Sequence, residues 1–147
     1  QLKLFRQTMY EQALKAYETA QKTAIHLDEL ERLVIARATY RMTSASETFH
    51  KSKEGYDKYA DALKYNQKLW TLIQSNILEN PTSCTATLRN SLLNLSLFID
   101  KQTITALRNP NPDHLIPLIK INKSISEGLH SPKTKNLGKV LKHRGIH

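Results

Sequence analysis

The sequence contains few of the residues that interrupt helices, form cross-links or build sheets. Its 147 residues include four glycines, five prolines and one cysteine. The first 80 residues hold no proline and a single glycine, Gly55, so long helices are allowed there. One cysteine, Cys84, cannot form an internal disulfide. No β-branched alternation of useful length and no Asn-Gly or Asp-Gly hairpin occurs, which argues against a sheet.

The motifs of an enzyme are missing as well. There is no glycine-rich phosphate loop and no C-x-x-C pair. Cys84 has no histidine or charged residue within four positions to activate its thiol. His143 and His147 are four residues apart, but they lie in a basic terminal segment with no glutamate between them. We therefore expect a non-enzymatic protein with no cofactor, no metal and no small-molecule substrate.

Charge is unevenly distributed along the chain. The net charge is +9, but residues 129–147 hold Lys133, Lys135, Lys139, Lys142 and Arg144 and no acid, which leaves +4 on residues 1–128. A basic end of this kind either contacts nucleic acid or an acidic partner, or is a solvated terminus. It has no Phe, Tyr or Trp to stack on bases, so direct contact with RNA is not expected. Apolar runs are too short to span a membrane.

Apolar residues recur at three- and four-residue spacing, the pattern of amphipathic helices. Asn80-Pro81 and the N-P-N-P run at 109–112 are helix stops, and Pro117 fits a helix only in its first turn. A turn is expected at 50–55, and Asp28 is a candidate N-cap. The pattern predicts an all-α, single-domain bundle of about five amphipathic helices, at about 9–23, 28–48, 56–79, 83–108 and 113–128.

Two asparagines interrupt the apolar stripes of different helices. Asn66 lies one turn before Trp70, and Asn122 lies on the stripe of the last helix. A buried amide without partners costs about 1–3 kcal/mol. We therefore expect each amide to be buried and hydrogen-bonded to a backbone group or a neighbouring helix, which would fix the helix register.

Several segments resemble one family in order along the chain. Y-N-Q-K-L-W, from Tyr65 to Trp70, resembles the N-x-[KR]-L-W signature of FlaF, a family of small flagellar biosynthesis regulators of α-proteobacteria. Leu88-Arg89 with L-L-N-L-S-L-F-I-D, and L-I-K-I-N-K-S-I-S-E-G-L ending at Leu129, resemble two later family segments, and A-Y-E-T-A-Q-K-T resembles the family's start. The motif residues are Asn66, Leu69, Trp70, Arg89, Asn122 and Gly128.

The resemblance divides the chain into residues 9–129, a FlaF-like helical domain, residues 1–8, a leader or remnant, and residues 130–147, a basic tail expected to be mobile. It implies a cytoplasmic protein that promotes flagellin production and export, either by binding unassembled flagellin as a chaperone or by regulating flagellin synthesis with FlbT or on flagellin mRNA. Flagellin is then the expected partner and FlbT a second one. Helix-binding residues would be Tyr65, Trp70, Leu93 and Phe98, with Trp70 either in a groove or in the core.

Overall fold

The computed structural model describes residues 11–19, 29–80, 82 and 85–127, and within them it contains helices and no strand. The all-α fold class is therefore confirmed. Expectations about residues 1–8 and 130–147 lie outside the described residues, as do those about Asp28, Cys84 and Gly128.

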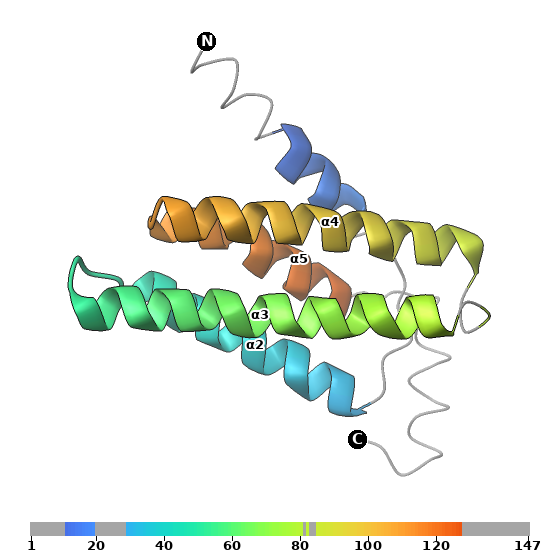
Figure 1. The fold of residues 1–147 in the computed structure, drawn as a ribbon, viewed down its shortest axis with the longest axis horizontal. Helices are drawn as coiled ribbons and strands as arrows, with labels where there is room; N and C mark the ends of the chain where they lie inside the picture. The colour runs from blue at the N-terminus through green and yellow to red at the C-terminus, as the bar shows by residue number, and fades with distance from the viewer. Residues whose placement is uncertain (1–10, 20–28, 81, 83–84, 128–147) are drawn as a thin grey trace.

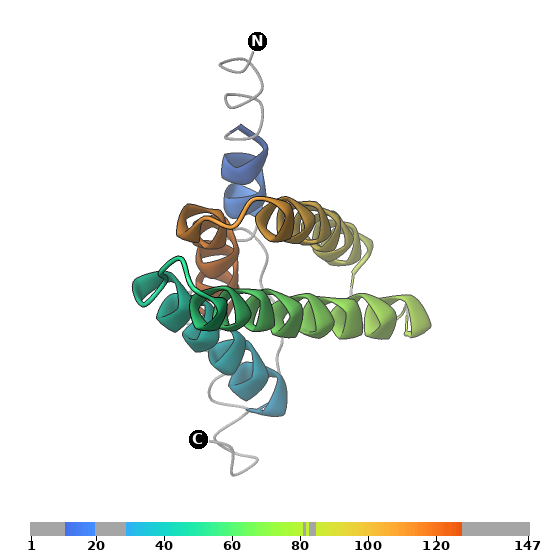
Figure 2. The ribbon, with the colours of Figure 1, turned by 60° about the vertical axis from the view of Figure 1, so that its left-hand side comes forward.

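The described helices pack into one bundle. α3 (Lys53–Glu79) and α4 (Ala86–Arg108) form a long hairpin and run side by side (Figures 1 and 2). α2 (Glu29–Glu47) packs against α3, and α5 (Ile116–Glu127) lies behind the α3–α4 hairpin and contacts α2 (Figure 1). A 3-10 helix, η1 (Pro112–Leu115), links α4 to α5, and residues 11–19 form a further helix next to α4.

α3 begins three residues earlier than the apolar pattern predicted. Ser52 caps its N-terminus, because the Ser52 side chain accepts a hydrogen bond from the backbone N–H of Gly55. The expected turn at 50–55 was therefore too long. Gly55 lies in the first turn of α3, where a Cβ atom would overlap the carbonyl oxygen of His50. Glycine is required here by this close backbone approach.

The ends of α4 and the start of α5 also have local causes. α4 begins at Ala86 rather than at 83, because the Thr85 side chain accepts from the N–H of Leu88. After the N-P-N-P run, the Asn111 side chain accepts from the N–H of Asp113 and starts η1. Pro117 is the second residue of α5, so its missing N–H lies in the first turn, as predicted.

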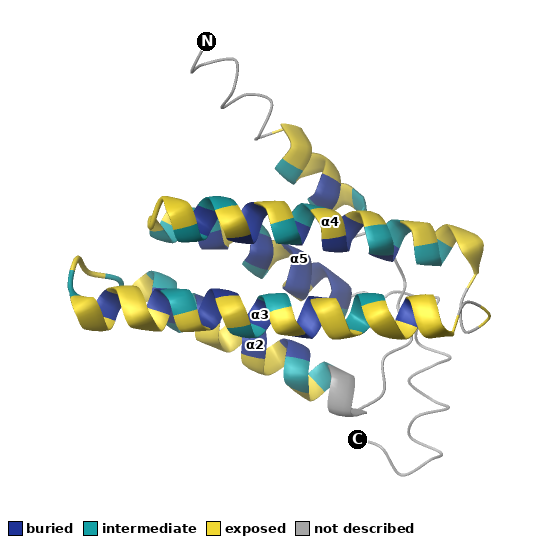
Figure 3. Ribbon diagram, in the orientation of Figure 1, coloured by how far each residue is buried: buried dark blue, intermediate teal, exposed yellow. Residues whose placement is uncertain are grey.

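The core is built from one face of each helix, and Figure 3 shows these buried positions turned toward the inside of the bundle. Burial of these large side chains is the main stabilising contribution. The largest fully buried side chains are Ile35 and Met42 of α2, Tyr59, Leu63 and Trp70 of α3, Leu95 and Ile99 of α4, Leu115 of η1, and Leu118, Ile121 and Ile125 of α5.

No helix in the described part of the chain is long and apolar enough to cross a bilayer.

Candidate functional site

The two asparagines meet in the core beside the tryptophan. The Trp70 Nε1–H donates to Asn122 Oδ1 at 3.0 Å, and Asn122 Nδ2 donates to Asn66 Oδ1 at 2.8 Å. Asn66 and Asn122 are fully buried, and Trp70 is 1% exposed. The prediction that both amides are buried and hydrogen-bonded is confirmed. Because Asn66 and Trp70 are one turn apart on α3, the single amide of Asn122 binds α5 to two points of α3.

One polar group of this cluster lacks a hydrogen-bond partner. Asn66 Nδ2 has no hydrogen-bond partner, although it lies in the core. Unpaired buried polar groups are costly and therefore uncommon. The arrangement fixes register, because a slide of α5 along α3 by one turn would break both hydrogen bonds.

A second polar contact closes the opposite end of the α3–α4 hairpin. The Tyr59 hydroxyl donates to the carbonyl oxygen of Ala106 at 2.7 Å and accepts from the N–H of Asn111 at 3.3 Å. Ala106 lies in the last turn of α4, where carbonyl groups lack helical partners. Burial raises the pKa of Tyr59, and the backbone hydrogen bond from Asn111 offsets part of that rise. Tyr59 therefore remains a neutral hydroxyl that joins α3 to the end of α4.

Gln102 completes this end of the bundle. Its Nε2 donates to the carbonyl oxygen of His114 at 2.9 Å, which connects α4 to η1. Tyr59 and Gln102 stand at three- and four-residue spacing with the apolar residues of α3 and α4, but the sequence analysis gave neither of them a role. The signal that could have identified them was a polar group among apolar residues at helical spacing. For Gln102 this is the same signal, an amide on an apolar stripe, that identified Asn66 and Asn122.

The partner-binding residues expected from the sequence do not form one surface. Trp70 is in the core, so its groove interpretation was wrong: an indole with 1% exposure offers no contact area to a partner. Tyr65 lies on the α2 side of α3, where the guanidinium of Arg41 stacks 4.3 Å from the centre of its ring. Leu93 and Phe98 are on α4, and both are half-buried and packed against the core.

Phe98 lies next to the first described helix. Together with Lys101 and Leu97 it lines a shallow depression between α4 and residues 11–19, with Lys15 and Ala16 on the other wall. This ring is therefore partly covered by the chain itself.

The outward side of α4 carries apolar side chains that the sequence analysis did not select. Leu97 is 54% exposed and Ile104 is 45% exposed. Leu93, Leu97 and Ile104 follow each other at spacings of four and seven residues, so they lie along one face of the helix. We call these three residues the α4 stripe. Exposed apolar residues in a row on a helix are suited to binding another helix.

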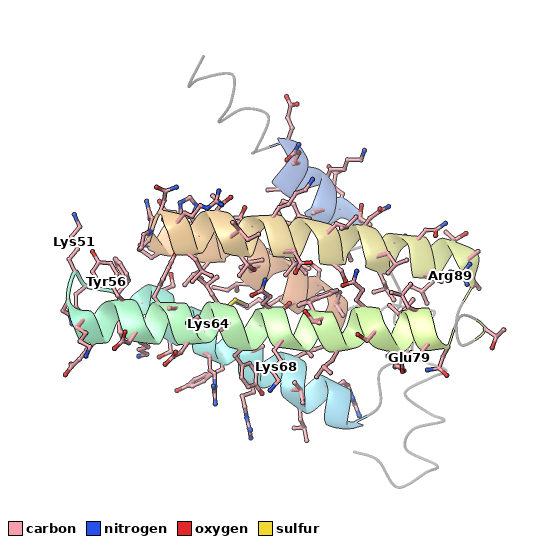
Figure 4. The ribbon with its side chains drawn as sticks, in the orientation of Figure 1. Lys51, Tyr56, Lys64, Lys68, Glu79 and Arg89 are labelled. Carbon is pink, nitrogen blue, oxygen red and sulfur yellow. The ribbon has the colours of Figure 1, made fainter. Side chains whose placement is uncertain are left out.

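The remaining motif residues have structural positions. Leu69 is buried on α3. Arg89 is half-buried in the first turns of α4, beside the connection from α3 (Figure 4).

The described residues hold no cluster of three or more His, Cys, Asp or Glu side chains that could bind a metal ion.

Comparison with protein families gives a match over most of the chain. The family model for the flagellar protein FlaF matches residues 13–129, which is most of the chain. No curated protein and no solved structure matches the chain.

Proposed function

The chain belongs to the FlaF family of flagellar proteins, and we propose that it is a non-enzymatic chaperone that binds unassembled flagellin in the cytoplasm and so promotes flagellin production and export. Flagellin monomers have amphipathic terminal segments without a partner before assembly. Such segments are recognised by exposed apolar rows on a helical surface.

The observation that supports this proposal is the α4 stripe. Leu93 packs partly on the core and fixes one end of the row, while Leu97 and Ile104 leave about half of their surface in water. The exposed Asn94 borders the row, whereas the half-buried Asp100 and the exposed Lys101 lie within it, between Leu97 and Ile104. Apolar side chains mixed with polar ones are common in protein interfaces.

The expected contribution of each leucine or isoleucine follows from its exposed area. Full burial of such a side chain is worth about 1.5–3 kcal/mol, so covering the exposed half of Leu97 gives about 1–1.5 kcal/mol. Leu97→Ala should then weaken flagellin binding about five- to tenfold. Ile104→Ala should have a similar effect, because Ile104 is exposed to a similar degree.

The matched control is Leu33→Ala on α2. Leu33 is 61% exposed, so the change removes the same atoms from a helix surface far from the α4 stripe in sequence. Isothermal titration of the three variants with purified flagellin monomer tests the assignment. A loss of affinity in Leu97→Ala and Ile104→Ala with none in Leu33→Ala supports the α4 stripe. An equal loss in all three, or none, contradicts it.

A further inference from the structure

A second surface lies on the outer side of α2 and α3, away from the α4 stripe. Its side chains recur at alternating steps of three and four residues on both helices, so each set forms one row. We call the two rows together the α2–α3 face. The rows are Leu33, Arg37, Tyr40, Ser44 and Glu47 on α2, and Lys58, Asp61, Tyr65, Lys68 and Leu72 on α3.

Two contacts give the register between these rows. Arg41 stacks on Tyr65, and Lys58 Nζ donates to Thr48 Oγ1 at 2.8 Å. Moving seven residues forward on α2 thus matches moving seven residues back on α3, as in an antiparallel pair. Tyr40 therefore stands level with Tyr65, Leu33 with Leu72, Arg37 with Lys68, and Ser44 with Asp61.

The α2–α3 face carries exposed large side chains at its centre and at one end. Tyr40, at the centre, is 73% exposed, and Leu33 and Leu72, which form one end, are each 61% exposed. Tyr40 and Ser44 also line a shallow depression whose opposite wall is Asp57 and Asp61. Large exposed side chains beside a depression are typical of an interface rather than of a solvated helix surface.

The charges on this face change sign from one end to the other. Beyond the tyrosines toward the α2–α3 turn lie the exposed acids Glu47, Glu54, Asp57 and Asp61, with Lys58 among them. Toward the other end lie the exposed cations Arg37 and Lys68, and Lys68 projects from α3 in Figure 4. At the centre lie Tyr40, Tyr65 and the exposed Arg41 that stacks on Tyr65. Because one end is acidic and the other basic, a 180° turn brings the acids of one copy to the cations of the other.

We propose that the α2–α3 face binds a second copy of the chain about a two-fold axis that crosses the helices at the tyrosine level. α3 of one protomer then runs antiparallel to α3 of its partner. Lys68 of each protomer meets Asp61 of the other, with Arg37 beside them, and Leu72 comes level with Lys58 of the other at the end of the depression away from Tyr40. A two-fold interface uses the same patch on both copies, which is what this charge pattern requires.

The size of the face sets the strength of the dimer. From Leu33 to Glu47 the row is about 21 Å long at 1.5 Å per residue. Two helix rows of this length give a buried area at the small end of the range for specific interfaces. The dimer should therefore dissociate on dilution, with a dissociation constant in the micromolar range. The α4 stripe stays free in this arrangement, and the dimer is independent of flagellin binding.

Sedimentation equilibrium of the full chain from about 1 µM to about 500 µM tests the proposal. Asp61→Lys and Lys68→Glu should each weaken self-association about tenfold or more, because every reversed charge acts twice in a two-fold dimer. An equimolar mixture of the two variants should associate more tightly than either variant alone. In the mixed dimer the two substituted positions face each other with opposite charges, and the native pair is kept at the other end. Lys101→Glu on α4 is the matched charge control and should change nothing.

Recovery in the mixture is a result that a folding defect cannot produce. A chain that stays monomeric over the whole range overturns the proposal. A dimer whose association neither charge reversal weakens also overturns it. So does a dimer that each reversal weakens and that the mixture of the two variants does not strengthen.

Discussion

Replacing Asn122 with leucine should be among the most damaging single changes in the core, and more damaging than the same change at Asn66. Asn122→Leu keeps a branched side chain of similar size, so the main effect is the loss of two hydrogen bonds. Trp70 Nε1 and Asn66 Oδ1 would then be buried and unpaired, in addition to Asn66 Nδ2, which has no partner already. At about 1–3 kcal/mol for each of the two newly unpaired groups, the free energy of unfolding should fall by about 2–6 kcal/mol.

Asn66→Leu should change the free energy of unfolding much less. It removes the unpaired Nδ2 together with the side chain, and only Asn122 Nδ2 loses its partner. One unpaired group replaces another, so the expected loss is about 0–1.5 kcal/mol. The double variant leaves only Trp70 Nε1 unpaired, and the wild type also has one unpaired group. Asn66→Leu should therefore rescue most of the loss in Asn122→Leu, with a coupling of about 2 kcal/mol or more.

The assay is denaturant unfolding followed by the fluorescence of Trp70, the only tryptophan in the chain, and by circular dichroism. Asn90→Leu on the exposed side of α4 is the control and should stay within about 0.5 kcal/mol of the wild type. The reasoning is refuted if Asn66→Leu costs as much as Asn122→Leu, or if the two effects simply add.

Three further predictions concern other parts of the chain. Tyr59→Phe should lower the free energy of unfolding by about 1–2 kcal/mol in denaturant titrations at neutral pH. Burial raises the pKa of Tyr59, so the contribution of its neutral hydroxyl to stability is complete below about pH 10 and is lost as the pH rises through the folded-state pKa. The wild type should therefore lose its stability advantage over Tyr59→Phe at alkaline pH. Gly55→Ala should lower the free energy of unfolding by about 1–3 kcal/mol in the same titration, because the alanine Cβ would overlap the His50 carbonyl. Alanine in place of glycine usually stabilises a helix, so a stabilised variant would contradict this close approach. Removing residues 130–147 should leave the melting temperature nearly unchanged, and a loss of several kcal/mol would show that the tail packs on the bundle.

The fold was predictable because helix periodicity and helix stops act locally. The N-P-N-P run after Arg108 and the apolar stripes predicted the number of α-helices found in the described part of the chain. The start of α3 was predicted too late, because Gly55 was taken as part of a turn, whereas it lies in the first turn of a helix capped by Ser52. The approach of the His50 carbonyl to Gly55 is defined only in the folded chain. Local spacing does not report contacts between segments that are distant in sequence.

The same limit explains the result for the candidate site. An amide on an apolar stripe correctly indicated that Asn66 and Asn122 need buried partners, but spacing could not show that they would pair with each other and with Trp70. Periodicity also placed Trp70 and Tyr65 on helix faces without showing which helix covers each face. Asn122 of α5 bonds the first and Arg41 of α2 stacks on the second, and the surface that we propose for flagellin therefore lies elsewhere, on α4.

The most direct test of flagellin binding is one titration of the full chain with purified flagellin monomer at low and at high salt. Apolar burial depends little on ionic strength, whereas each neutralised phosphate of a bound message adds to a steep salt dependence. We predict micromolar or tighter flagellin binding that survives high salt and weakens about five- to tenfold in Leu97→Ala. The chaperone proposal is contradicted if flagellin does not bind at micromolar concentration, while flagellin message binds with a strong salt dependence and that binding is lost on deletion of residues 130–147. This result would favour a regulator that acts on the message or with FlbT.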